Sequence, residues 1–168
     1  MTAPALAPTP APAKEPRRVW HGIESPEPPV AAADYAAIRA MAERMLEARR
    51  KRFPQLIAAG RMEAGDAAAQ IAVFEALAAE WRWMATGTGA PADHAMLPAI
   101  TAALDTSIAT IAEIAMEDGG LSMNLAAQAE WVIAMAWHLE PGRRTRAARA
   151  QTFLWRQLIA ATPASLSR

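Results

Sequence analysis

From position 34 onward, hydrophobic side chains recur at steps of three and four residues, which is the spacing of one face of an α-helix. No stretch alternates hydrophobic and polar residues for long enough to indicate a strand. The spacing predicts helices at about 34–53, 64–84, 98–118, 122–139 and 145–161. A chain of 168 residues has the size of one domain. We therefore expect an all-α fold, with about five helices in one compact bundle over residues 33–168.

The segment before this bundle has a different composition. Eight of the thirteen prolines lie before Val30, and proline has no amide hydrogen to donate to a helix or a sheet. We therefore expect residues 1–32 to form a disordered tail rich in proline and alanine. Within it, Val19, Trp20 and Ile23 can bind either a partner or the chain's own domain. The second interpretation is favoured, because the domain of the same chain is present at a much higher effective concentration.

The connection between the first two expected helices has the features of a structural corner. Phe53 and Pro54 are expected to end the first helix, because the residue before a proline is pushed out of the α region. Gly60 is suited to a left-handed turn. A DNA-reading helix-turn-helix fits less well, because the connection over residues 60–66 is longer than its turn of three to four residues. The structural corner is favoured over a binding site.

The same stretch carries a resemblance to a known group of proteins. The sequences "RRKRFPQLIAAGRM" and "AAAQIAVFEAL" resemble a segment of small, functionally uncharacterised phage and prophage proteins of alphaproteobacteria. The resemblance covers residues 49–77, and Glu63 and Gln70 depart from its pattern. The matching positions are Arg49 or Arg50, Phe53, Pro54, Leu56, Ile57, Gly60, Arg61, Met62, Ala67, Ile71, Val73, Glu75 and Leu77. The resemblance implies a helix-corner-helix unit in a phage-type context, and it brings no catalytic residue.

The fourth expected helix is hydrophobic around most of its circumference. Ser122 is a suitable N-cap, and every side chain from Trp131 to Trp137 is hydrophobic. Such a helix cannot face water, so it lies either at the centre of the bundle or at a self-association surface. The candidate self-association residues are Trp131, Val132, Met135 and Trp137. We lean slightly toward a dimer, since the hydrophobic seam of the preceding helix is narrow.

The charge pattern leaves room only for a local binding patch. The chain has 17 basic and 17 acidic residues, so no net charge attracts it to nucleic acid or anionic lipid. The cluster "ARRKR" at 48–52 lies at the C-terminal end of a helix, where positive charge is favourable. The cluster "RRTRAAR" at 143–149 opens the last helix, where positive charge is unfavourable and therefore calls for a reason.

The last helix carries the candidate surface for an anionic partner. Its members are Arg143, Arg146, Arg149, Phe153 and Arg156. In a helical projection the last four share one side, opposite Leu154 and Leu158. Arginines around an aromatic ring suit a phosphate-bearing or acidic partner. Arginine stems that cover Phe153 at a solvated surface are the simpler interpretation.

No catalytic or metal-binding motif stands out. The absence of cysteine excludes disulfides and thiolate sites, and the three histidines have no partner at the spacing of a helical metal site. The segment "GTGAPAD" lacks the strand and the lysine of a phosphate loop. The longest hydrophobic run is too short to cross a bilayer, and no signal peptide begins the chain. We therefore expect a cytoplasmic protein with no catalytic residue, no metal, no cofactor and no membrane partner.

These observations favour a non-catalytic helical interaction or assembly protein in a phage- or prophage-type context. Its expected partner is another protein or a second copy of the chain. The alternative is a nucleic-acid-associated accessory protein that binds through the Arg-rich helix near the C-terminus. An enzyme ranks third, because an apolar pocket with a few polar groups leaves no clear pattern in one sequence.

Overall fold

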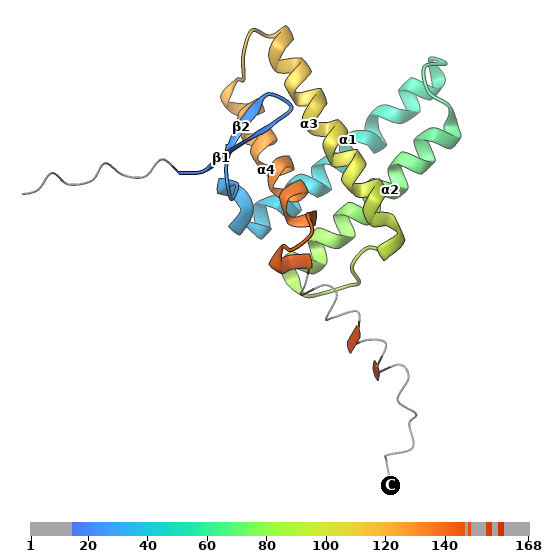
Figure 1. Ribbon diagram of the computed structural model, residues 1–168. Helices are drawn as coiled ribbons and strands as arrows, with labels where there is room; N and C mark the ends of the chain where they lie inside the picture. The colour runs from blue at the N-terminus through green and yellow to red at the C-terminus, as the bar shows by residue number, and fades with distance from the viewer. Residues whose placement is uncertain (1–14, 147, 149–153, 156–157, 160–168) are drawn as a thin grey trace, which may run out of the picture.

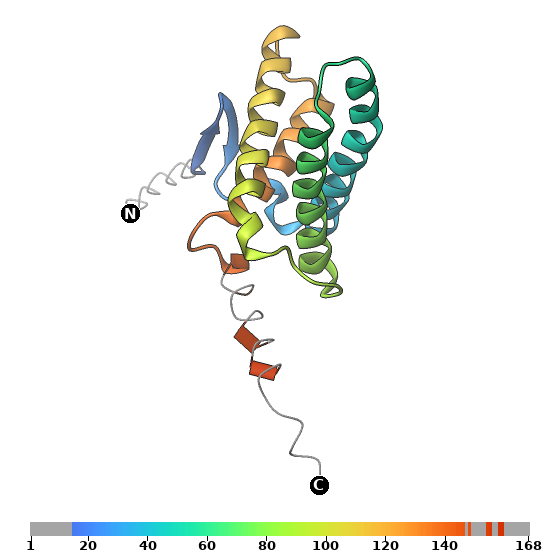
Figure 2. The same cartoon turned by 90° about the vertical axis from the view of Figure 1, so that its right-hand side faces the viewer.

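The computed structural model describes residues 15–146, 148, 154–155 and 158–159. Its main elements are four long helices: α1 (Tyr35–Ala58), α2 (Ala64–Thr86), α3 (Leu97–Glu117) and α4 (Met123–Leu139). They run alternately up and down (Figures 1 and 2). The α1–α2 and α3–α4 connections therefore lie at the same end of the bundle. The all-α helical bundle is confirmed, and most of the fifth expected helix, at 145–161, lies outside the described residues.

Local signals placed several elements correctly. The expected seam of α3, formed by Ile100, Leu104, Ile108, Ile111 and Ala115, is buried along its whole length. Gly119 follows α3 with a φ of +76°, a conformation that glycine adopts without steric cost. Ser122 caps α4, and its Oγ accepts a hydrogen bond from the Leu125 amide at 3.2 Å.

The predicted end of the first helix at Phe53 is wrong. Helix α1 continues through Pro54 to Ala58. Pro54 is exposed, so the carbonyl group that loses its helical partner can be solvated. Phe53 is buried and Leu56 is half-buried, and both lie near the start of α2.

The corner after this turn is formed as expected. Gly60 has a φ of +65°. The Gly60 amide donates to the Ile57 carbonyl at 3.0 Å, and the Arg61 amide donates to the Leu56 carbonyl at 2.9 Å. This pair of hydrogen bonds is the Schellman arrangement that ends a helix at a left-handed glycine.

The boundary of the predicted N-terminal tail is corrected. Residues 17–33, most of them assigned to the tail, form an antiparallel hairpin of β1 (Arg17–Trp20) and β2 (Ile23–Pro26), followed by the 3-10 helix η1 (Val30–Ala33). Each strand has four residues, too few for a clear alternating pattern. Ile23 is buried in the core, and Trp20 packs against it. The segment is therefore bound to the chain's own domain, which is the interpretation that the sequence favoured.

Helix α4 lies at the centre of the bundle. It packs against α1, α3, η1 and β2. Val132, Ile133 and Met135 are fully buried, whereas Trp131 and Trp137 are half-buried. Val132 and Met135 therefore cannot form a self-association surface, and this part of the prediction is corrected: elements of the same chain cover them. Trp131 and Trp137 keep some exposed surface, and self-association through them stays a prediction.

Helix α3 also has the dimensions of a membrane span. Within the described residues, the helix His94–Glu117 is long and hydrophobic enough to cross a bilayer. The core helix of a bundle meets the same criterion, and Ile100, Leu104 and Ile108 are fully buried among the other helices. Length and composition alone therefore do not assign α3 to a membrane.

Candidate functional site

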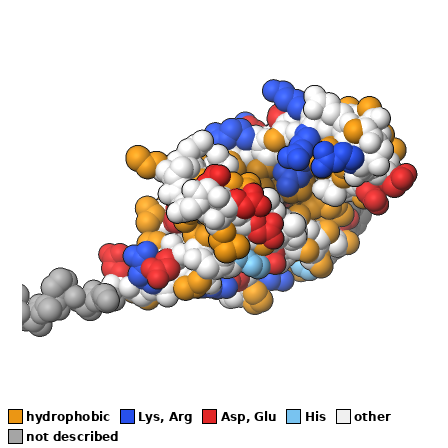
Figure 3. Space-filling model, turned by 90° about the horizontal axis from the view of Figure 1, so that it is seen from above, with side chains coloured by type: hydrophobic (Ala, Val, Ile, Leu, Met, Phe, Trp, Pro, Cys, Tyr) orange, Lys and Arg blue, Asp and Glu red, His pale blue; other side chains and the backbone are white. Residues whose placement is uncertain are grey.

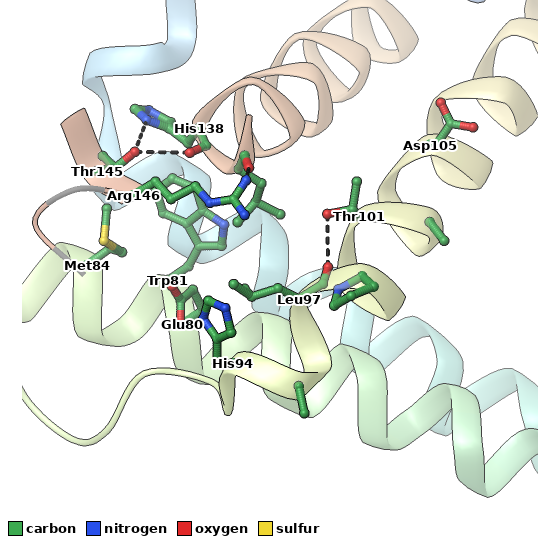
Figure 4. A pocket seen from close by; sticks show the side chains of 14 residues that line it. Glu80, Trp81, Met84, His94, Leu97, Thr101, Asp105, His138, Thr145 and Arg146 are labelled. Carbon is green, nitrogen blue, oxygen red and sulfur yellow. Dashed lines mark hydrogen bonds between the residues drawn. The ribbon is translucent and has the colours of Figure 1, made fainter. Parts of the chain in front are cut away.

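A cavity of about 760 Å³ lies at the end of the bundle opposite the α1–α2 corner. Figure 4 shows the side chains that line it. Its walls come from α2, from α3 and the 3-10 helix η2 (His94–Met96) before it, and from the end of α4. Its large hydrophobic lining residues are Trp81, Met84, Leu97 and Leu139. The polar side chains that line it are Glu80, His94, Thr101, Asp105, His138, Thr145 and Arg146. A mostly apolar cavity with a few polar groups is typical of a binding site.

His138 is a buried residue of the cavity wall that contacts several segments of the chain. Its Nε2 donates to the Ala32 carbonyl at 2.7 Å, and its Nδ1 lies 3.1 Å from the Thr145 hydroxyl. The rings of Tyr35, Trp81 and Trp137 contact the imidazole edge-on, at centroid distances of 5.5, 5.3 and 5.0 Å. Burial lowers the pKa of His138, partly offset by its hydrogen bond to Ala32. The hydrogen bond from Nε2 joins α4 to η1, and Nδ1 faces the hydroxyl of Thr145 in the segment after α4.

Glu80 is a buried carboxylate that lines the cavity and was not predicted from the sequence. Its side chain is buried, and its Oε2 accepts a hydrogen bond from the Ala92 amide at 2.8 Å. This bond ties the α2–α3 connection to α2. The only available signal was position: Glu80 follows Leu77 by three residues and therefore shares a buried face of α2.

The hydroxyl groups of the cavity are also engaged by the chain. Thr101 donates to the Leu97 carbonyl at 2.9 Å, and Thr145 donates to the His138 carbonyl at 3.1 Å. Within the part of the chain that the structure describes, no group of three or more His, Cys, Asp or Glu side chains is placed to hold a metal ion. Thr101 thus bonds within its own helix, whereas Thr145, Glu80 and His138 join different segments of the cavity wall.

Arg143 belongs to a polar cluster on the outside of α4. Glu27 Oε1 accepts hydrogen bonds from Trp137 Nε1 at 2.6 Å and from Arg143 Nη2 at 2.8 Å. Arg143 also pairs with Glu140 at 2.6 Å and stacks 3.9 Å from the Trp137 ring centroid. Burial raises the pKa of Glu27, but the hydrogen bonds from Trp137 and Arg143 lower it more, so the pKa lies below its usual value. The cluster fastens the segment after β2 to α4.

The predicted surface for an anionic partner is therefore corrected in its first two members. Arg143 is bound within the cluster, and Arg146 donates to the Leu139 carbonyl at 2.9 Å. Both side chains turn back to the C-terminal end of α4, where donors and positive charge are favourable. The other three members, Arg149, Phe153 and Arg156, lie outside the described residues.

The hydrophobic side of the last expected helix is exposed. In the helical projection Leu154 and Leu158 lie opposite the side that carries the arginines. The exposed fractions of Leu154, Trp155, Leu158 and Ile159 are 58, 67, 64 and 68%. These described residues lie beyond the end of the bundle (Figure 2). We call them the C-terminal patch.

Comparison with known proteins found no matching family, no similar curated protein and no similar solved structure. The resemblance of residues 49–77 to phage-type proteins stays a prediction.

Proposed function

We propose that this chain is a non-catalytic helical module that assembles with a protein partner through its C-terminal patch. The observation that carries the proposal is the exposure of Leu154, Trp155, Leu158 and Ile159. Leaving hydrophobic surface in water costs roughly 25 cal/mol for each Å². A group of large hydrophobic side chains that its own chain leaves exposed is typical of a surface that binds a partner.

The spacing of the patch indicates how the partner is bound. Positions 154, 155, 158 and 159 follow the steps of one and four residues that place side chains on one face of a helix. A helix with one hydrophobic face binds by lying in a hydrophobic groove of its partner. The cavity adds support, because Thr145 and Arg146, which precede the patch in the chain, line it. This end of the molecule therefore combines an exposed hydrophobic patch with a hydrophobic cavity.

Two further observations support this function over the other hypotheses. His138, Thr101 and Thr145 are bonded within the fold, which favours a structural role over catalysis. Arg143 and Arg146 are bonded to the end of α4, which weakens the nucleic-acid alternative. The resemblance of residues 49–77 supports a phage- or prophage-type context for the assembly.

Site-specific photo-crosslinking tests the proposal in the full-length chain. A photoreactive phenylalanine analogue replaces Trp155, and the control carries it at Thr106, an exposed position on α3. We expect one protein to be crosslinked at position 155 and not at position 106, and Leu158→Asp should abolish this product. Equal products at both positions, or none at position 155, would overturn the proposal.

A further inference from the structure

A second binding surface lies at the opposite end of the bundle, at the α1–α2 corner. A groove of about 700 Å³ runs between the two helices there. Phe53, Leu56 and Met62 contribute hydrophobic surface to it. Its basic side chains are Arg49, Arg52 and Arg61, and Asp66 and Gln70 complete its polar rim. We call this feature the corner groove.

The positive charges of the corner groove have no acidic partner within the described chain. No carboxylate of the described residues lies within 4.0 Å of Arg49, Arg52 or Arg61, nor of the neighbouring Lys51. Arg50 provides the contrast, because it pairs with Glu47 at 2.7 Å and with Glu75 at 2.8 Å. Arg50, outside the groove, is therefore neutralised by carboxylates of its own chain. The arginines that line the groove can pair with carboxylates of a partner.

Arg49 is the most unusual of these cations. It is half-buried and lies with its guanidinium carbon 3.3 Å from the centroid of the Phe74 ring. Its one hydrogen bond to a protein group in the described region goes to the Met45 carbonyl at 3.0 Å. Burial lowers the pKa of Arg49 to about 10, so the group remains charged at neutral pH. A partly buried charge of this kind is normally paired with an opposite charge.

The α3–α4 connection, at the same end of the bundle, has the complementary character. Glu113, Glu117 and Asp118 are exposed there, and no basic group of the described residues lies within 4.0 Å of them. Met116, Leu121 and Met123 are exposed beside them. We call these six residues the acidic tip. Figure 3 looks onto this end and shows basic side chains grouped on one part of it and acidic and hydrophobic side chains on another.

We propose that this end of the bundle binds the same end of a second copy, with the corner groove of each chain holding the acidic tip of the other. The two-fold axis lies in the end face, between the corner groove and the acidic tip. Rotation about this axis places the groove of one chain opposite the tip of the other. Such a self-complementary interface is the commonest way in which identical chains pair. Both contacts join opposite charges and bury hydrophobic side chains on each side.

A protein surface fits the corner groove better than a nucleic acid does. The three carboxylates of the acidic tip lie at the same end of the bundle as the corner groove. These negative charges repel phosphates. The hydrophobic side chains of the groove, in turn, are matched by Met116 and Leu121 of the tip. The contact is separate from the C-terminal patch, so failure of this inference would leave the proposed function in place.

Reversal of charge on each side tests the pairing. One variant carries Arg52→Glu and Arg61→Glu, and the other carries Glu117→Arg and Asp118→Arg. All four side chains are exposed, so both variants should fold, as checked by circular dichroism. Every chain also carries Leu158→Asp, which removes association through the C-terminal patch. Sedimentation measures the dissociation constant of the dimer.

We expect each charge-reversal variant to raise this dissociation constant by about tenfold or more. An equimolar mixture of the two variants should form a heterodimer, because its acidic grooves meet basic tips and its basic grooves meet acidic tips. The control Arg144→Glu, which changes an exposed cation at the other end, should leave the dimer intact. A parent chain that stays monomeric, a dimer that survives the reversals, or a mixture that does not associate would overturn the proposal. DNA binding by a monomeric parent chain that is lost in the Arg52→Glu/Arg61→Glu variant would replace it with a nucleic-acid site.

Discussion

Two segments of this chain have similar hydrophobic content and opposite surroundings. The run Trp131–Trp137 in α4 and the C-terminal patch at 154–159 each combine tryptophan with large aliphatic side chains. In α4, Val132 and Met135 are fully buried, whereas in the patch Trp155 and Leu158 are more than half exposed. Hydrophobic content thus shows that a segment needs cover, and it does not show whether the same chain provides that cover.

The cover of α4 comes from residues far away in the sequence. Ser25 donates to Glu130 at 3.1 Å, and Trp137 donates to Glu27 at 2.6 Å. These bonds join positions 105 and 110 residues apart. The four side chains of the C-terminal patch, by contrast, are more than half exposed.

The largest expected difference in stability is between a charge placed in α4 and a charge placed in the C-terminal patch. Met135→Asp puts a carboxylate at a position with no exposed surface, and we expect it to lower the free energy of unfolding by about 4 kcal/mol or more. Leu158→Asp is the matched control, and should change the free energy of unfolding by no more than about 0.5 kcal/mol. Chemical denaturation followed by tryptophan fluorescence measures both. Equal losses would show that the C-terminal patch is also part of the core.

A smaller effect should follow from trimming the hairpin that covers α4. Ile23 is buried against the core, and Ile23→Ala should cost about 2–3 kcal/mol through lost burial and the cavity that remains. Val19 is a hydrophobic neighbour in the same hairpin and is exposed, so Val19→Ala should have little effect. If the two variants were equally stable, the hairpin would not be contributing to the core in solution.

The corner that turns α1 back onto α2 offers a third test. Gly60→Val places a β-branched side chain at a φ of +65°, and should cost about 1–2 kcal/mol. Gly65 lies in the first turn of α2, where an added Cβ would meet no other atom within 4 Å, so Gly65→Ala should instead gain about 0.4–1 kcal/mol. Thermal unfolding of both variants compares them. A Gly60→Val variant as stable as the parent chain would contradict the left-handed turn.

The smallest effect concerns pH and the histidine buried beside α4. The pKa of His138 lies below its usual value of 6.5, so the unfolded chain binds a proton there more readily than the folded chain. The neutral His138 therefore contributes to the free energy of unfolding in full when the pH is above 6.5. This contribution is lost as the pH falls toward the lower pKa of the folded state. We expect the free energy of unfolding to decrease between about pH 7.5 and 5.5, a range above the titration of carboxylates such as Glu27. His138→Gln should remove part of this slope, and an unchanged slope would contradict the assignment.

Features that depend on neighbouring residues can be predicted from the amino-acid sequence. The seam of α3, the Ser122 cap and the turn at Gly60 each follow from spacing or from the preference of one residue type. The hydrophobic circumference of α4 also showed that this helix needs cover on all sides. These signals act within a few residues along the chain, so they can be identified without knowledge of the fold.

Contacts between distant segments became known from the three-dimensional fold. It placed η1 and the hairpin on α4, carried α1 past Pro54, and buried Glu80 against the α2–α3 connection. It also bound Arg143 to Glu27 and left Trp155 exposed. Each of these outcomes depends on contacts between distant parts of the chain, or on their absence. Such contacts arise from packing in three dimensions, which the spacing of residues along one segment does not contain.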